Sequence, residues 1–172
     1  MIKILISILC LIIPACGGGI PENLTAVDGF DVNRYLGTWY EIARMDHSFE
    51  RGLTDVTATY TSRDDGGIKV INKGYDKVRS GWKQVEGRAY FTGDKTEGRL
   101  KVSFFRPFYG GYNILALDRE NYSYSLVCGP DKSYLWILSR TKKMDDVNKN
   151  KLIALARSLG FATDKLIMVE QK

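Results

Sequence analysis

Hydrophobic and polar residues alternate in short runs over most of this chain, which is the pattern of β-strands that bury one face. Gly, Asp and Pro interrupt the runs, and Asp64-Asp65-Gly66-Gly67 is a typical hairpin turn. The alternation predicts eight strands, over residues 38–45, 56–61, 68–75, 85–92, 100–105, 112–117, 122–127 and 134–140. A short helical turn is expected before the first strand, over residues 31–36.

After the eighth strand the spacing of apolar residues changes to that of an α-helix. This helix is expected to begin at Asp145-Asp146 and to end at about Leu159, before Gly160. Its apolar face consists of Leu152, Leu155, Ala156 and Leu159. A short strand over residues 166–169 follows. These elements predict an all-β fold, an eight-stranded antiparallel up-and-down barrel with a C-terminal helix packed on its outside.

The first residues have the features of a signal peptide. Lys3 supplies a positive charge, and residues 4–13 form an apolar segment that is too short to span a bilayer. It ends in Ile13-Pro14-Ala15-Cys16, which resembles the bacterial lipobox, whose Cys receives a lipid and begins the mature chain. The expected organisation is a lipoprotein signal peptide over residues 1–15, a linker over 16–23 that starts at the lipidated Cys16, and a barrel domain over 24–172.

Gly17 follows Cys16, as in lipoproteins that are sorted to the outer membrane. The expected location is therefore the bacterial outer membrane, with a lipid anchor and the domain facing the periplasm. The alternative is an ordinary secretory signal cut after Ala15, which leaves Cys16 as a free thiol able to form a bridge with Cys128. If Cys16 carries lipid, Cys128 has no partner and is expected to be a small buried hydrophobe.

Composition limits the classes of function. The chain has 172 residues, of which 44% are hydrophobic, enough for one domain with a substantial core. Its formal net charge is +5, with basic residues dispersed among acidic ones. This dispersion argues against nucleic-acid binding and fits a general attraction to anionic lipid surfaces.

The sequence offers little for catalysis. His47 is the single histidine, and neither a Cys-x-x-Cys motif nor a phosphate-binding glycine loop is present. The paired carboxylates Asp64-Asp65 and Asp145-Asp146 are explained by a turn and by a helix start. We therefore predict a protein that is not an enzyme, with no catalytic residues, no metal site and no cofactor.

Trp39 and Arg140 are the residues expected to close the barrel. Trp39 lies at an inward-facing position of the first predicted strand, and Arg140 ends the last one. An indole at this place plugs one end of a barrel, and a guanidinium stacks on it while donating to nearby carbonyls.

Three motifs carry a resemblance to a known family. They are Gly37-Thr38-Trp39-Tyr40-Glu41, Leu117-Asp118-Arg119-Glu120-Asn121-Tyr122 and Leu135-Trp136-Ile137-Leu138-Ser139-Arg140. With these three motifs in this order, the chain resembles the lipocalins over residues 22–170, and most closely the bacterial outer-membrane lipoproteins of that family. The resemblance implies a barrel that binds a small hydrophobic molecule in its interior.

Strand alternation, counted from Trp39 and Arg140, predicts which side chains face the interior. The predicted lipid-binding residues are Ala58, Tyr60, Val70, Ala89, Val102, Phe104, Tyr112, Ile114, Trp136 and Leu138. The same count turns Glu41, Ala43, Ala116, Tyr124 and Leu126 inward. The alternative is a solid barrel in which these side chains are core.

The open mouth is expected at residues 49–53, 76–81, 106–109 and 130–132. There Lys77, Arg79 and Arg106 are candidates to meet a carboxylate or phosphate headgroup. Phe49, Phe108 and Tyr109 are candidates to line the entrance. Solvated loop residues are the alternative for each cation.

A fatty acid or lysophospholipid is the expected ligand, carried or scavenged in maintenance of the envelope. A tetrapyrrole, retinoid or sterol would suit the same barrel, and some lipocalin relatives are enzymes. A homodimer is left open by the sequence.

Overall fold

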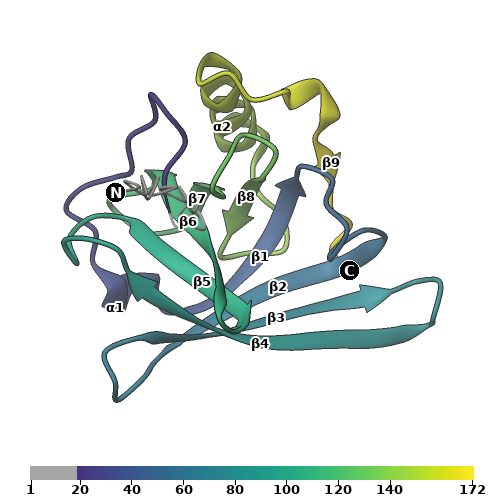
Figure 1. Ribbon diagram of the computed structural model, residues 1–172. Helices are drawn as coiled ribbons and strands as arrows, with labels where there is room; N and C mark the ends of the chain where they lie inside the picture. Colours follow the sequence, from purple (N-terminus) through teal and green to yellow (C-terminus); the bar gives the residue numbers. More distant parts are fainter. Residues whose placement is uncertain (1–18) are drawn as a thin grey trace, which may run out of the picture.

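The computed structural model describes residues 19–172 (Figure 1). The predicted signal peptide and the predicted lipidation site, Cys16, lie outside the described residues. Eight antiparallel strands form the barrel: β1 (Gly37–Arg44), β2 (Leu53–Ser62), β3 (Ile68–Asp76), β4 (Gly81–Phe91), β5 (Arg99–Phe105), β6 (Phe108–Leu117), β7 (Tyr124–Cys128) and β8 (Leu135–Ser139). A two-residue strand, β9 (Ile167–Met168), pairs antiparallel with β1. The predicted up-and-down barrel is confirmed.

The barrel closes because β1 pairs with both β2 and β8. Trp39 lies opposite Ala58 on β2, and Glu41 lies opposite Leu138 on β8. Since directly opposed residues share a face of the sheet, these four side chains all point into the barrel. Closure also pairs the backbone N–H and C=O groups along the edge of β1 that would otherwise lack partners.

Two α-helices and a short 3-10 helix, η1 (Thr163–Lys165), complete the fold within residues 19–172. The short α1 (Val32–Tyr35) lies at one end of the barrel, and the long β3–β4 hairpin reaches out at the other (Figure 1). The helix α2 (Asp146–Ser158) begins at Asp145, whose carboxylate accepts a hydrogen bond from the Asn148 N–H at 2.8 Å. It ends before Gly160, whose φ of +85° lies in the left-handed region. No helix within residues 19–172 is both long and apolar enough to cross a bilayer.

The apolar side chains form two clusters on opposite sides of the barrel wall. The first fills the end of the barrel near α1 and includes Trp39 and Tyr60. The second lies between the wall and α2, where Leu152 and Ala156 are buried. The burial of these two residues confirms the predicted packing of the helix on the outside of the barrel. Leu155 was expected on the same buried face but stays partly exposed.

Irregular pairing changes which residues of β1 face inward. The register of β1 against β8 shifts between Glu41 and Ala43. An extra residue in a strand reverses the side of every residue beyond it. Ala43 therefore packs in the outer cluster, so the prediction that it faces inward is wrong. Arg44, opposite the inward-facing Trp136, turns into the barrel instead.

A second shift has the same effect within β6. The register of β6 against β7 changes between Ile114 and Ala116, so Ala116 belongs to the outer cluster and its predicted inward orientation is wrong. Tyr124 and Leu126 also belong to the outer cluster, and their predicted inward orientation is wrong. β7 itself pairs regularly with β8, and Val127, opposite the inward-facing Ile114 and Trp136, is the residue that packs inside.

Candidate functional site

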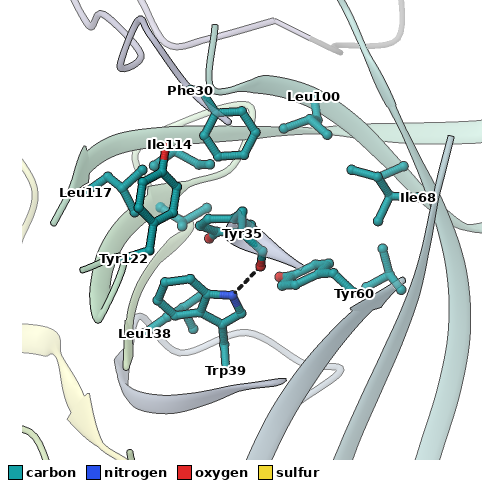
Figure 2. Close-up of a cluster of buried hydrophobic side chains, with 13 residues drawn as sticks. Phe30, Tyr35, Trp39, Tyr60, Ile68, Leu100, Ile114, Leu117, Tyr122 and Leu138 are labelled. Atoms are coloured by element: carbon teal, nitrogen blue, oxygen red, sulfur yellow. Dashed lines mark hydrogen bonds between the residues drawn. The ribbon is translucent and has the colours of Figure 1, made fainter. Parts of the chain in front are cut away.

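One end of the barrel is sealed by Trp39. Its indole N–H donates to the Tyr35 carbonyl at 2.8 Å, the bond drawn in Figure 2, and its ring is fully buried. The Arg140 guanidinium lies 4.0 Å from the centre of the Trp39 ring. It also donates to the carbonyls of Thr38, Arg34 and Leu36 at 2.8–3.0 Å. The stacking of the guanidinium on the indole and its bonds to nearby carbonyls are the contacts expected for this pair.

A layer of tyrosines lies above this seal. The Tyr112 hydroxyl is hydrogen-bonded to those of Tyr35 and Tyr60 at 2.8 and 2.9 Å. Tyr35 also bonds Ser125 at 3.1 Å. Burial raises the pKa of Tyr35 to about 12 and raises the pKa of Tyr60 and Tyr112 well above their usual value. This floor is therefore uncharged at physiological pH.

All ten predicted lipid-binding residues lie in the inner cluster or pack against it. Five of them are buried: Tyr60, Val70, Ala89, Ile114 and Leu138. The other five, although they point into the barrel, are only partly buried: Ala58, Val102, Phe104, Tyr112 and Trp136. These five side chains therefore keep solvent-accessible surface although they face the interior of the barrel.

Two glycines show where the bore is filled and where it is open. Gly87 faces inward opposite Val70, and a Cβ added there would lie 2.7 Å from the Phe104 ring. Gly110 faces inward opposite Val102, and a Cβ added there would meet nothing within 4 Å. Phe104 thus occupies space that Gly87 leaves free, whereas space next to Gly110 is empty of protein atoms.

Polar groups gather on the wall of the bore beside Trp136. Arg44 donates to Glu41 Oε1 at 2.7 Å and to the Glu50 carbonyl at 2.8 Å. Glu50 Oε2 accepts from the Trp136 indole at 3.1 Å and lies 3.0 Å from His47 Nε2. These contacts fold the β1–β2 connection over the wall and fix the Trp136 ring.

The two carboxyl groups of this network differ in their electrostatics. Burial, followed by the charge of the neighbouring Glu50, raises the pKa of Glu41 well above its usual value, and Arg44 only partly offsets them. Burial also opposes the ionisation of Glu50. Hydrogen bonds with His47 and Trp136 outweigh it and lower the pKa of Glu50. Glu50 is thus the anion, and Glu41 retains its proton more readily.

Sequence reasoning placed Glu41 inside but missed the rest of this network. It treated His47 as an isolated residue and did not consider Arg44 or Glu50. The available signal was the i, i+3 spacing of Glu41 with Arg44 and of His47 with Glu50. In a regular strand, residues three positions apart lie on opposite faces, so this spacing does not predict a contact. Glu41 and Arg44 meet because of the bulge in β1, which was not foreseen.

The loops at the mouth hold the expected residues in different surroundings. Phe49 stacks on His47 with ring centres 3.9 Å apart, and Phe108 is exposed at the β5–β6 hairpin. Tyr109 does not line the entrance, because its ring packs against Lys101 and Tyr90 on the outer face. Cys128 is fully buried in the outer cluster, which raises its pKa to about 12.

The closed barrel, its Trp–Arg seal and its apolar interior define a lipocalin. The model of the family described as a lipocalin-like domain matches residues 30–171, and the chain belongs to this family. Lipocalins are a class of proteins that bind hydrophobic molecules in the barrel, and this chain shares that general function.

Its curated relatives narrow the class. The chain is 62% identical to the outer membrane lipoprotein Blc of Citrobacter freundii, over 88% of this chain and 85% of that protein. It is 52% identical to the protein of the same name from Vibrio cholerae, over 96% of each. The chain is accordingly a lipid-anchored protein of the outer membrane. Among solved structures, insecticyanin from Manduca sexta has a TM-score of 0.70 at 20% identity, covering 90% of this chain and 87% of that one, a likeness of fold.

Proposed function

We propose that this lipocalin binds a single-chain amphiphile, a fatty acid or a lysophospholipid, and carries or scavenges it in maintenance of the outer membrane. The observation that carries the proposal is the partial exposure of the inward-facing Val102, Phe104 and Trp136, above an uncharged tyrosine floor. An acyl chain fits an apolar shaft that ends in neutral hydroxyls. A headgroup would then lie toward the mouth, near the polar network of Arg44 and Glu50.

The energetics of such binding are favourable. Burying a chain of about sixteen methylenes contributes on the order of 13 kcal/mol at ~0.8 kcal/mol per CH₂. Loss of translational and rotational freedom costs roughly 4–15 kcal/mol. Micromolar to nanomolar affinity is therefore expected from the acyl chain without strong contacts to the headgroup. The proposed role is binding, with no catalytic step.

The test is a fluorescence titration with palmitate and with a lysophospholipid, with affinity measured independently by displacement of a fluorescent fatty acid. Trp136→Ala is expected to abolish most of the tryptophan signal change and to weaken binding. Trp82→Ala is the matched control, since Trp82 is on the outer face, where its ring makes an edge-to-face contact with Tyr75. Saturable binding unchanged by Trp136→Ala contradicts the proposed bore.

The class of ligand is tested by extraction. Mass spectrometry of molecules released from the natively purified protein is expected to find fatty acids or lysophospholipids. Recovery of a tetrapyrrole, retinoid or sterol at stoichiometric amounts would instead show another lipocalin ligand class. Conversion of a bound ligand into a product would show an enzyme.

We also propose Cys16 as the residue that carries the anchor. Mass spectrometry is expected to show an acylated Cys16 as the mature N-terminus. The Cys16→Ala protein is expected to be lost from the membrane fraction. An unmodified Cys16, or a mature chain that starts elsewhere, contradicts this assignment.

A further inference from the structure

The open end of the barrel carries an exposed apolar rim. In an up-and-down barrel the β1–β2, β3–β4 and β5–β6 connections lie at the same end, opposite α1. Four large apolar side chains on or beside these connections are exposed to solvent: Phe49 (59% exposed), Val78 (92%), Phe105 (77%) and Phe108 (68%). Single exposed apolar residues are common, but several from three separate hairpins at one end of a domain mark an interaction surface.

Basic residues accompany the apolar ones. The four connections at this end, residues 45–52, 77–80, 106–107 and 129–134, contain Arg51, Lys77, Arg79, Arg106 and Lys132. Their exposed acidic residues are Asp46, which pairs with Arg51 at 2.7 Å, and Asp131. Lys77 pairs with Glu170, and Arg79 lies 3.9 Å from Asp76. Arg106, between the two exposed phenylalanines, has no ion-pair partner within residues 19–172. The rim is therefore apolar with a positive surround.

The N-terminal segment enters the fold at this same end. The Gly19 carbonyl accepts a hydrogen bond from Asn113 Nδ2 at 3.3 Å, and the same amide donates to the Gly129 carbonyl at 3.2 Å. Gly129 begins the β7–β8 connection, which is one of the four at the mouth. Cys16 is three positions before Gly19 in the sequence, and a chain spans at most ~3.6 Å per residue, so the two Cα atoms are within about 11 Å. An anchor at Cys16 would thus hold this end of the barrel near the bilayer.

From these three observations we propose that the rim of Phe49, Val78, Phe105 and Phe108 docks on the phospholipid surface that holds the anchor. The aromatic rings enter the interfacial region of the bilayer while the surrounding cations face lipid phosphates. The mouth of the bore then opens onto the membrane, and the end sealed by Trp39 and Arg140 faces away from it. An acyl chain passes between leaflet and bore without crossing water. The proposal goes beyond ligand binding, because it assigns a second surface and its partner.

Position-specific fluorescence tests the orientation. A polarity-sensitive dye is attached at Phe105→Cys in the full-length, lipid-anchored protein, reconstituted in vesicles of phosphatidylethanolamine and phosphatidylglycerol. Its emission is expected to shift to the blue and to be quenched by spin-labelled lipid. The control is Val147→Cys, an exposed position at the start of α2, just beyond the Arg140 end of the barrel. Equal behaviour of the two dyes overturns the proposal. So does a shift at residue 105 that depends on protein concentration in the absence of vesicles, since a second copy would then cover the rim.

Charge substitution tests the affinity of the rim without the anchor. In the full-length Cys16→Ala background, Val78→Asp with Phe105→Asp is expected to weaken binding to the same vesicles by about tenfold or more. Val147→Asp is expected to have no effect. Palmitate binding in vesicle-free solution is measured on the same proteins. Loss of vesicle binding with palmitate binding intact supports docking. Equal vesicle binding by the rim variant and its parent overturns docking and leaves the proposed ligand binding untouched. Absence of palmitate binding in the parent overturns the proposed function alone.

Discussion

The guanidinium of Arg140 lies 4.0 Å from the centre of the Trp39 ring and joins the end of the last strand to two segments far from it in the sequence, residues 34–38 and Tyr122. It donates to carbonyls of α1, of the α1–β1 link and of β1, and to the Tyr122 carbonyl before β7. A single side chain thus ties the first strand to the end of the last one, and it satisfies backbone groups that closure of the barrel would leave unpaired.

Loss of this side chain should destabilise the fold. Arg140→Ala is expected to lower the free energy of unfolding by about 2–4 kcal/mol, because several carbonyls lose a charged donor. Arg140→Lys should recover only part of this, since an ammonium cannot reproduce the planar fork. Urea denaturation measures the effect. Arg88→Ala on the outer face of β4 is the control, with an expected change within about 0.5 kcal/mol. Equal stability of the Arg140 and Arg88 variants would contradict the assigned role.

Gly110 offers a way to block the bore without disturbing the floor. A Cβ at this position meets no atom within 4 Å, so Gly110→Leu is expected to fold normally and to place its side chain in the open space. Affinity for a fatty acid should fall by about tenfold or more because the acyl chain loses that volume. Displacement titrations measure the affinity, with Glu86→Leu on the outer face as the control. Unchanged affinity would show that the ligand does not occupy this part of the barrel.

Gly87 provides the opposite case. Gly87→Ala would bring a Cβ to 2.7 Å from the Phe104 ring and 2.8 Å from the Ser103 carbonyl. Because the carbonyl belongs to the backbone, the strand itself must shift, and a loss of about 1–3 kcal/mol in unfolding free energy is expected. Thermal and urea unfolding check this value. Gly110→Ala, with no such contact, is the matched control and should be near neutral.

Opposite pH dependences are expected from the two buried glutamates. The pKa of Glu41 is raised on folding, so between its usual value near 4.5 and its folded value the native state holds the extra proton. Its contribution to stability is present below the usual pKa and is lost as the pH rises through the folded pKa. Glu41→Gln should therefore gain stability relative to the wild type at about pH 8 compared with about pH 5.

The contribution of Glu50 to stability changes with pH in the opposite direction. Its folded pKa is lowered, so its contribution is present above the usual pKa and is lost as the pH falls through the folded pKa. Glu50→Gln should therefore be less stable than the wild type at neutral pH, with a difference that narrows in acid. Urea denaturation across about pH 4–9 measures both variants. Parallel profiles for the two substitutions would contradict the assigned protonation states.

The buried thiol gives a simple check on the outer cluster. Because burial raises the pKa of Cys128 to about 12, it should not react with a maleimide at neutral pH in the folded protein. Reaction is expected on unfolding in urea. Rapid labelling under native conditions would show that the cluster between the barrel wall and α2 opens.

The sequence alone determined the order and type of the elements. Period-two alternation broken by turn residues gave the eight strands, and the change of spacing after Arg140 gave α2 with its Asp145 cap. These features are local, because a strand or helix is specified by which neighbours along the chain are apolar. Trp39 and Arg140 were also foreseeable, since each sits at a fixed position relative to the first or last strand.

Only the tertiary structure decided which side chains meet in the bore. Ala43 and Ala116 were predicted inside and lie outside, because the registers of β1 and β6 shift by one residue. The same shift in β1 turns Arg44 inward, where it meets a carboxylate from its own strand and a carbonyl from the following loop. Side-chain direction in a strand has a period of two, so one extra residue reverses it. Whether a strand accommodates that residue depends on its neighbours in the closed barrel, and not on its own sequence.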